Sequence, residues 1–590
     1  MSVCMGKATP DAKLEEVCHT ETSRQKTPTL EASGMTQLPE STNCLASSED
    51  GRYLSLGHSQ GFSVWCASAL ICVTEWLQDA VEMASIQMTE MSETAYLLGT
   101  VDDMGVARVF AFRGEDIHLL SVINVMENVN ERSICLTFEM SEGGDYGAAM
   151  IRCNGAVWLE VHRFPSEVWQ KELEMLQKQD PSVDVDFKWS PASLVFKITP
   201  PETLAARPLE DFFTHCLALD THTSSSYQQG EQASKAEAGK IKENNERRCT
   251  HHFLLPCGQL IGDNRAKPQP GFPIAVCVWW SGSHNFFEYS LQNALKKKSA
   301  DVEPLPDGMW PNANVIVCSA VSRSTRYVAH GLDNGVICVW DRQSGSPLSV
   351  VLVSAADSAF LRMQFVDNAP LSADDSHSSF TEKVNILVMC KSGAIHTVTT
   401  GREIQSCTIQ LADSPRPNHS GDLPTVATSV PFLQSLLLVL QRNGEMFLLD
   451  AINKTTVCLL VPLKTHSIAS PCNPVYALNS EQQTLFMKGI HVSAHDLNPS
   501  CSVPSLLGES PSQLLVFRFG ESDVIRQYII STAANTERCP SSLEETCDLY
   551  LQQRALSFDE RNKALKQTWN QLEETAVTLQ MKSSQAHIKK

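Results

Sequence analysis

The segment Gly57-His58-Ser59-Gln60-Gly61 has the glycine and serine spacing of the nucleophile elbow found in serine hydrolases. In those enzymes a strand turns sharply into a helix, and the turn exposes the serine above the sheet. Here the residues that follow, FSVWC, alternate like another strand. We therefore expect a hairpin turn in which the glycines serve backbone geometry, and no catalytic serine.

A second group with possible chemistry lies in CTHHFLLPC, which places Cys249, His251, His252 and Cys257 within a short stretch. A structural zinc site needs four ligands that converge tetrahedrally. On a strand the two adjacent histidines would point to opposite faces, so both cannot join the same cysteines without a kink. We expect an ordinary strand that leaves a polar loop, and no metal.

Other familiar motifs of catalysis are missing. The sequence has no GxxxxGK[ST] and no HExxH, and no GxGxxG follows a strand and opens a helix. We predict no catalytic residue, no cofactor-binding residue and no metal ligand. An enzyme whose site is assembled from distant loops in a central channel stays open as an alternative.

Composition narrows the class of protein further. The chain has 590 residues, 42% of them hydrophobic, which suits several domains or one large repeat architecture. Its 47 Lys+Arg and 67 Asp+Glu give a formal net charge of -20, which repels phosphate backbones and anionic lipids. The 20 cysteines are scattered singly, as in a reducing compartment, and the longest apolar run, Phe432 to Leu440, is too short for a membrane span. We expect a cytoplasmic protein that binds other proteins, with no nucleic acid partner and no membrane insertion.

Short strands in a repeated order are the elements that must position these residues. In GLDNGVICVWDRQSG, residues 331–345, a glycine turn leads into a strand that ends in Trp-Asp. With NVIVCSAV and RYVAHGL before it and LSVVLV after it, this makes four short strands in about forty residues, the size of one propeller blade. The same order recurs at residues 43–77 and 86–123.

Weaker copies of the pattern occupy much of the remaining chain. We count eight candidate blades and predict a ring of seven or eight, because closure removes exposed sheet edges. The weaker copies lie at residues 134–164 with a fourth strand from Ala192, at 212–291 with a long insert, at 361–400, from VATSVPF to Leu463, and from VYALN through IRQYIIST to Thr532.

The Trp-Asp strand ends, the glycine turns and the spacing resemble WD40 repeats. The resemblance implies an all-β, WD40-type β-propeller of seven or eight blades that is built for protein contacts. Such blades often join a turn to a core strand through a network of His, Ser or Thr, Asp and Trp, and here His330 stands at the hydroxyl position. The resemblance assigns the structural repeat motif to Asp333, Gly335, Trp340, Asp341 and Trp65.

The non-repeating segments complete the domain organisation. We expect residues 1–38 to be disordered, although a short piece could close the ring as an added strand, and residues 39–532 to form the propeller. Residues 221–248 read as a disordered loop. Residues 165–179 read as a helical insert that either covers its own blade or docks a partner, with an apolar stripe of Val168, Trp169, Leu173 and Leu176.

The C-terminal segment has a different pattern. Residues 541–580 read as a helix with a coiled-coil-like seam, followed by a disordered tail at 581–590. A helix of this length must bury its stripe, either by folding back on the propeller or by binding another chain, and both stay open. The candidate partner-binding residues are Leu551, Phe558, Leu565, Trp569, Leu572 and Leu579.

The whole chain also resembles a family of WD-repeat proteins associated with motile cilia and the axonemal central apparatus. That resemblance implies a non-catalytic interaction scaffold of the cilium or flagellum axoneme, with large axonemal or scaffold proteins as partners. A trafficking or coat adaptor built on the same fold is the first alternative, and the enzyme with a channel site is the second.

Overall fold

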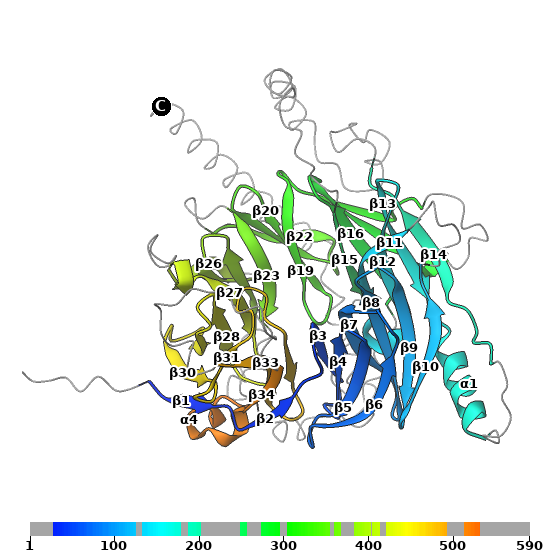
Figure 1. Cartoon of the computed structure of the whole chain (residues 1–590). Helices are drawn as coiled ribbons and strands as arrows, with labels where there is room; N and C mark the ends of the chain where they lie inside the picture. The colour runs from blue at the N-terminus through cyan, green and yellow to red at the C-terminus, as the bar shows by residue number, and fades with distance from the viewer. Residues whose placement is uncertain are drawn as a thin grey trace, which may run out of the picture.

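The fold is described from a computed structural model (Figure 1). The residues that the structure describes are 27–124, 133–178, 187–201, 248–256, 273–294, 304–353, 359–366, 383–402, 404–413, 420–492 and 512–530. The predicted strands 212–220, the predicted loop 221–248 apart from Arg248, and the C-terminal segment 541–590 therefore lie outside the described residues. Among the described residues, no helix is long and apolar enough to cross a membrane.

Eight sheets, antiparallel apart from one parallel strand pair at the edge of one of them, form a ring, and we call them blades 1 to 8 in chain order; the predicted all-β, WD40-type propeller is confirmed with eight blades. The first four blades each have four strands. Blade 1 is β3 (Cys44–Ser47), β4 (Tyr53–His58), β5 (Gly61–Cys66) and β6 (Ile71–Leu77); blade 2 is β7 (Met83–Ser92), β8 (Ala95–Asp102), β9 (Ala107–Arg113) and β10 (Asp116–Val122); blade 3 is β11 (Ile134–Met140), β12 (Tyr146–Cys153), β13 (Ala156–Arg163) and β14 (Ser193–Ile198); blade 4 is β15 (Cys249–Leu254), β16 (Ala275–Trp280), β17 (Asn285–Ser290) and β18 (Gly308–Pro311).

The second four blades include the closure of the ring. Short helices join or follow several strands: η1 (Glu142–Gly144), α1 (Ser166–Lys178), α3 (Leu291–Ala294), η2 (Ser420–Asp422), η3 (Phe519–Glu521) and α4 (Asp523–Arg526). Blade 5 is β19 (Ile316–Val321), β20 (Tyr327–Leu332), β21 (Val336–Asp341) and β22 (Ser346–Leu352); blade 6 is β23 (Phe360–Val366), β24 (Lys383–Cys390), β25 (Ile395–Gly401) and β26 (Ile404–Ala412); blade 7 is β27 (Pro424–Ser429), β28 (Leu436–Gln441), β29 (Met446–Asp450), β30 (Thr456–Val461) and β1 (Thr29–Glu31); blade 8 is β31 (His466–Ile468), β32 (Tyr476–Asn479), β33 (Thr484–His491), β34 (Ser512–Arg518) and β2 (Gly34–Gln37).

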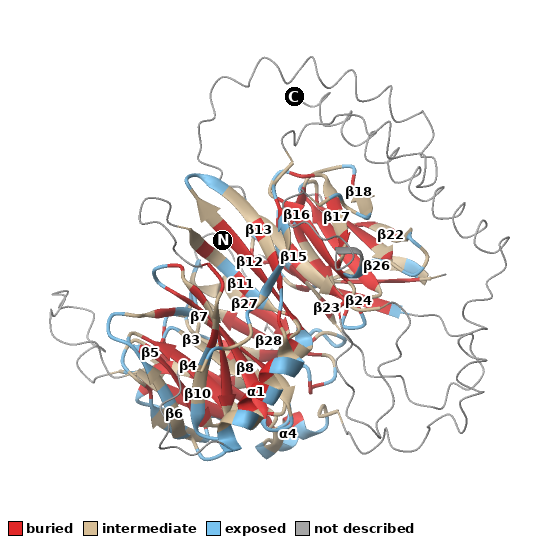
Figure 2. Ribbon diagram, turned by 90° about the vertical axis from the view of Figure 1, so that its right-hand side faces the viewer, coloured by how far each residue is buried: buried red, intermediate tan, exposed pale blue. Residues whose placement is uncertain are grey.

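Apolar packing between neighbouring blades closes the ring. Eight clusters of buried hydrophobic residues each join one blade to the next, and the buried residues in Figure 2 lie inside the sheets, between turns that are largely exposed. The last junction packs Leu54 and Leu56 of blade 1 against Phe486 and Leu514 of blade 8. Apolar side chains therefore fill all eight interfaces between blades, and their removal from water stabilises the ring.

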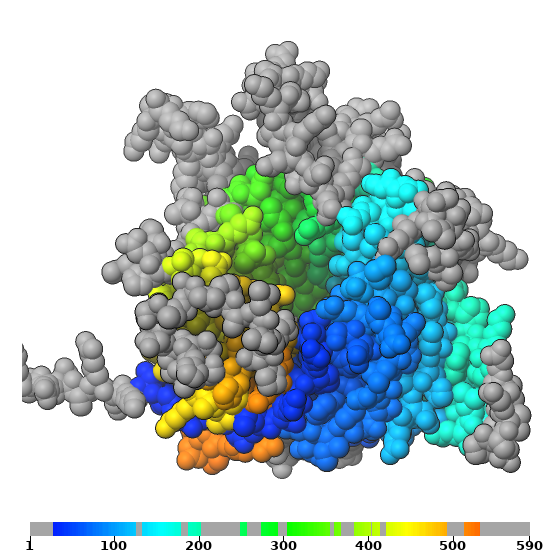
Figure 3. All heavy atoms as spheres, viewed as in Figure 1, coloured from blue at the N-terminus to red at the C-terminus, as the bar shows by residue number. Residues whose placement is uncertain are grey.

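The N-terminal strands join blades 7 and 8. Strand β1 pairs in parallel with β30, and three residues later β2 pairs antiparallel with β34 as the outer strand of blade 8. In Figure 3 the dark-blue strands accordingly lie on the surface beside the orange segment that carries β34 and α4. The expectation of disorder for residues 1–38 is therefore wrong for 29–31 and 34–37, whereas the alternative of an added closing strand is confirmed.

Three details of the strand assignment are also wrong. The fourth strands of blades 4 and 6 are β18 and β26, which we did not assign. In blade 8 the segment IRQYIIST forms no fourth strand: Asp523–Arg526 are helical, and Ile529 makes a single bridge to Leu433. The outer position of blade 8 is taken instead by β2, because that strand enters directly from the N-terminal side and leads on to blade 1.

One irregularity recurs in the outer strands and indicates a shared blade design. An extra residue interrupts the pairing of the third and fourth strands in six blades. Such a bulge re-aims side chains, and each extra residue packs into a cluster between blades. These residues are Val73, Leu120, Val195, Leu348, Leu411 and Val457.

Helix α1 connects β13 to β14 and covers its own blade. Trp169 and Leu173 are buried in the cluster between blades 2 and 3. Trp169 Nε1 donates to the carbonyl of Ser190 at 2.7 Å, and the hydroxyl of Ser190 donates to Glu172 at 2.6 Å. The predicted helical insert is thus present, but Val168, which we placed in its buried stripe, is 42% exposed.

Candidate interaction surfaces

The Trp-Asp strand end of blade 5 is a structural joint. Asp341 is buried, and its carboxylate accepts hydrogen bonds from the backbone N–H of Gln343 at 3.0 Å, from Arg326 at 3.4 Å and from Arg402 of blade 6 at 3.2 Å. Trp340 stacks on Trp310 of blade 4, with ring centroids 6.1 Å apart. Both side chains therefore join blade 5 to its neighbours.

The other repeat-motif residues of blade 5 do not assemble the network expected from the family. Asp333 is exposed in the β20–β21 turn, and its backbone N–H donates to the carbonyl of Val315 at 3.0 Å. Gly335 takes a φ of 79° in that turn, which favours glycine. His330 is fully buried, and its Nδ1 lies 3.3 Å from Asn312. Trp340 Nε1 has no hydrogen-bond partner among the described residues, so these side chains form no continuous network.

Two other tryptophans do reach serine hydroxyls. Trp65 Nε1 donates to Ser63 at 2.8 Å within blade 1. Trp279 Nε1 of blade 4 donates at 2.8 Å to Ser319 of blade 5, and the same hydroxyl lies 2.7 Å from His252 Nε2. The second arrangement joins two blades and was not found from the sequence, because its members lie on different repeats.

The Gly-His-Ser-Gln-Gly segment forms the β4–β5 hairpin, as predicted. Ser59 and Gln60 are the turn, and no helix follows. Gly61 has a φ of 129°, and an added Cβ there would lie 2.1 Å from the carbonyl oxygen of Trp76. At Gly57 an added Cβ would lie 2.3 Å from Cys44 Sγ. Both glycines are therefore required by local packing, and the resemblance to a nucleophile elbow is accidental.

The two histidines of β15 point to opposite sides, as predicted for a strand. His251 Nε2 lies 3.3 Å from Glu139 Oε2 of blade 3, whereas His252 faces Ser319 of blade 5. Cys257 lies outside the described residues. Within the described part of the chain, no three His, Cys, Asp or Glu residues lie close enough together to hold a metal ion.

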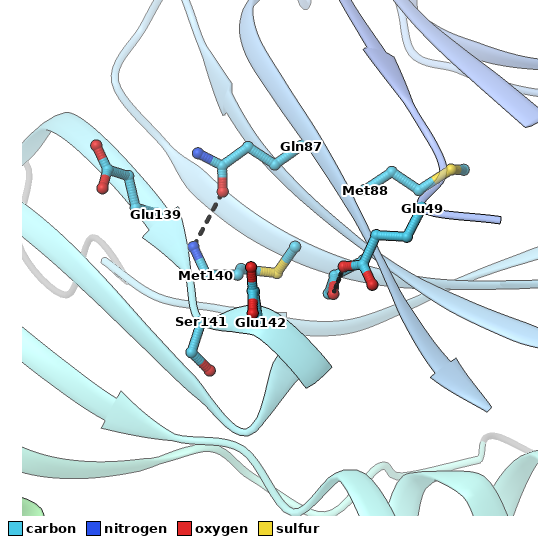
Figure 4. A pocket seen from close by; sticks show the side chains of 8 residues that line it. Glu49, Gln87, Met88, Glu139, Met140, Ser141 and Glu142 are labelled. Carbon is cyan, nitrogen blue, oxygen red and sulfur yellow. Dashed lines mark hydrogen bonds between the residues drawn. The ribbon is translucent and has the colours of Figure 1, made fainter. Parts of the chain in front are cut away.

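A pocket of about 280 Å³ lies between blades 1, 2 and 3 (Figure 4). Glu49 from the β3–β4 turn and Glu142 from η1 both line it. The amide of Gln87 on β7 bridges to β11, because its Oε1 accepts from the backbone N–H of Met140 at 3.0 Å and its Nε2 donates to the carbonyl of Phe138 at 3.1 Å. The two hydrogen bonds of Gln87 therefore hold β7 and β11 together at the pocket, and Glu49 and Glu142 make its lining acidic.

Electrostatics make this pocket favourable for positive charge. Partial burial raises the pKa of Glu49 and a hydrogen bond from Thr89 lowers it, while the carboxylates of Glu142, Glu90 and Asp50 raise it further. A cation placed there would relieve the repulsion between these carboxylates. The pocket is therefore suited to bind positively charged groups and hydrogen-bond donors.

The corresponding turns of blade 5 contain arginines. In both blades 1 and 5 the turn between the first and second strands lies at the same end of the blade, since the strand order repeats. In blade 5 this turn and the next one toward the rim contain Arg323, Arg326 and Arg342. Arg342 Nη1 donates to the carbonyls of Leu255 and Thr325 at 3.1 and 2.6 Å. At this end of the strands, Glu49 and Glu142 therefore line the pocket of blades 1 to 3, whereas the turns of blade 5 contain three arginines, of which Arg326 pairs with Asp341.

Fold and surfaces together define a WD-repeat β-propeller, a class of protein whose members are typically non-catalytic scaffolds. More specifically, residues 42–337 match the family model of WD repeat-containing protein 93, and the chain belongs to that family. The matched part extends from the start of blade 1 into the third strand of blade 5.

Solved structures similar to this chain include other proteins of low sequence identity. Sqt1 of Saccharomyces cerevisiae is 10% identical, with 83% of this chain and 98% of that chain covered and a TM-score of 0.43. Chaetomium thermophilum Sqt1 bound to the N-terminus of ribosomal protein L10 is 11% identical, with 84% and 100% covered and a TM-score of 0.44. The β-propeller domain of Myceliophteria thermophila Cps50 (Swd1) is 8% identical, with 82% and 99% covered and a TM-score of 0.36.

The structure does not test the predicted partner-binding residues of the C-terminal segment. Leu551, Phe558, Leu565, Trp569, Leu572 and Leu579 lie outside the described residues. Their assignment stays a prediction from the heptad spacing alone.

Proposed function

We propose that this protein is a non-catalytic interaction scaffold of the motile-cilium axoneme, in the central apparatus. The observation that carries the scaffold role is the closed ring, in which eight apolar junctions fix eight sets of turns relative to one another. Rigid elements that present exposed turns are well suited to hold partner proteins in a defined geometry. The resemblance to ciliary WD-repeat proteins supports the location.

Fractionation of motile cilia tests the location. The endogenous protein is tagged in multiciliated cells or sperm, and the cilia are extracted with detergent and then with high salt. We expect the protein in the axonemal fraction that resists both treatments, because a scaffold is held by many contacts. Recovery only in the detergent-soluble fraction would contradict the proposal, and recovery on vesicles would favour a trafficking adaptor.

The C-terminal seam is the second attachment point in this proposal, and it rests on the sequence pattern. Replacing Leu565 and Leu572 with Asp places charges on the seam and should release the protein from axonemes. Replacing Gln553 and Gln567 with Asp adds the same charge two positions away from seam residues and should leave it bound. If the seam variant fails to fold in circular dichroism and thermal unfolding, the seam packs on its own propeller instead.

A further inference from the structure

The outermost strand of each blade ends in a sheet edge, whose backbone N–H and C=O groups are able to pair with another chain. Proteins block such edges with charged residues, proline, very short strands or a covering segment. Within the described part of the chain, seven of the eight blades have one of these features. Strands β6, β10 and β14 carry Glu75, Asp116 and Lys197, strands β18 and β22 contain Pro311 and Pro347, β30 is covered by β1, and β2 has four residues.

Strand β26 of blade 6 has none of these features. Its sequence is IQSCTIQLA, and with nine residues it is the longest of the outer strands that the structure describes. It lies on the outside of the ring, and among the described residues it pairs only with β25 (Figure 1). Residues 407–410 pair with β25 without interruption, and the irregularities of the strand lie on either side of them. In the described structure the outer edge of β26 is therefore unpaired and able to accept a further strand.

Blade 7 shows that this ring accepts such a strand. There β1 adds to the outer edge of β30, whose sequence TVCLLV also lacks charge and proline, and Leu30 of β1 is buried by the pairing. In blade 7 the uncharged edge is thus covered by a segment of the same chain. Blade 6 has an uncharged edge of greater length without a described cover.

The same strand of a second copy matches this edge in length and in charge. A two-fold axis sets two equal uncharged strands side by side, so that no like charges lie opposite one another. Antiparallel pairing about Thr408 also places the exposed Cys407 of each copy opposite Ile409 of the other. Because Ile409 packs against the apolar cluster between blades 6 and 7, the new contact would continue an existing interface.

The residues that flank the strand favour the antiparallel order over the parallel one. Asp413 follows the strand, whereas Arg402 and Glu403 precede it and cancel in charge. Parallel pairing would set the two Asp413 carboxylates at the same end of the strand pair. Antiparallel pairing separates them and places each one at the Arg402 end of the other copy.

We propose that β26 pairs with β26 of a second copy of this chain, antiparallel across a two-fold axis near Thr408, so that the two sheets of blade 6 become one continuous sheet. The dimer presents two propellers in a fixed relative orientation. This inference goes beyond the proposed scaffold function and does not depend on the ciliary location.

Sedimentation velocity of the full-length protein over a range of concentrations tests the pairing. Salt is kept near physiological strength, because each copy carries a net charge of -20. We expect a reversible equilibrium between monomer and dimer. The Gln405→Lys, Gln410→Lys variant should raise the dissociation constant about fivefold or more, because antiparallel pairing brings the lysines of the two copies together. The Gln60→Lys, Gln78→Lys variant adds the same charge at exposed positions of blade 1 and should leave the constant unchanged.

Cross-linking through Cys407 reports on the strand pair itself. Diagonal neighbours across two paired strands lie about 7–8 Å apart, which is within reach of a short bismaleimide. We expect a cross-linked dimer that is lost in Cys407→Ser and retained in Cys472→Ser, which removes another exposed thiol. Thermal unfolding of each variant shows whether a loss of dimer reflects a loss of folding.

Three results would overturn the proposal. The first is a protein that stays monomeric at all concentrations; protection of the β26 amides from hydrogen exchange would then show that a segment of the same chain covers the edge. The second is a dimer of equal strength in the Gln405→Lys, Gln410→Lys variant. The third is a dimer that dissociates in the Leu565→Asp, Leu572→Asp variant, which would place the contact in the C-terminal segment.

Discussion

Blades 5 and 8 have similar sheets, but they are built from differently placed parts of the chain. Blade 5 comes from one continuous segment, residues 316–352, with one strand per position. Blade 8 combines residues 466–518 with β2 from the other end of the described chain, and its inner strand is split into β31 and β32, which both pair with β33. Local repeats are therefore sufficient to form a blade, whereas closing the ring requires a strand that is far away in sequence.

Removing the N-terminal strands should have the largest effect. A chain that begins at Asn43 lacks β1 and β2, leaves the edge of β34 unpaired, and no longer buries Leu30 and Leu38. Two leucines contribute about 1.5–3 kcal/mol each on burial, so we expect a loss of at least about 3–6 kcal/mol in the free energy of unfolding. Urea unfolding followed by circular dichroism measures this loss.

Complementation makes the same experiment specific. A synthetic peptide of residues 27–42, added to the shortened chain, should restore much of the urea midpoint, because it can pair with β30 and β34. A peptide in which Leu30 and Leu38 are replaced by Asp is the matched control and should not. An unchanged midpoint in the shortened chain would show that blade 8 needs no strand from the N-terminal side.

Within blade 5, Asp341 should be the most sensitive polar residue. The Asp341→Ala variant leaves the N–H of Gln343 and the guanidinium groups of Arg326 and Arg402 without their buried acceptor. Hydrogen bonds to charged groups contribute about 1.5–3 kcal/mol, and we expect a loss of stability in that range. Asp341→Asn keeps one acceptor oxygen and should lose less. Equal urea midpoints for the two variants would mean that the carboxylate is not the joint between blades 5 and 6.

Acid should weaken the other side of blade 5, where it meets blade 4. Burial, and then the neighbouring His252, lower the pKa of His330 to about 3, so the folded protein keeps this ring neutral below pH 6.5 while the unfolded chain takes up a proton. The stability is therefore intact above pH 6.5 and falls as the pH drops toward 3, by about 1.4 kcal/mol per pH unit for this histidine. His330→Gln should flatten the dependence of the urea midpoint between pH 6.5 and 5; an unchanged slope would contradict this account.

The difference between the two blades also explains how much of the fold could be predicted. Blades 1, 2 and 5 were assigned strand by strand, because in each the alternation of apolar residues and the glycine turns are local features. Strand β18 was missed because GMWP is short and ends in proline, and β26 because IQSCTIQLA is a half-exposed rim strand with few buried residues. The hydrophobic IRQYIIST suggested a strand, but its first residue, Ile525, is buried in a helical turn.

The candidate sites were less accessible to sequence analysis. The acidic pocket combines residues from segments that are far apart, such as Glu49 with Glu139, and no spacing rule links them. The serine of the hairpin at Gly57 to Gly61 matches a sequence motif, but in the structure it is a turn residue between two strands.

The smallest expected effect tests whether the repeat motif works here as it does in blades with a complete polar network. Asp333 is exposed, and the hydrogen bond from its backbone N–H to the carbonyl of Val315, at 3.0 Å, survives loss of the side chain. Asp333→Ala should therefore change the free energy of unfolding by no more than about 0.5 kcal/mol. A loss as large as that of Asp341→Ala would mean that Asp333 joins a network with His330 and Trp340 after all. The expected contrast between two aspartates eight positions apart would instead place the stability of this blade in its junctions with blades 4 and 6.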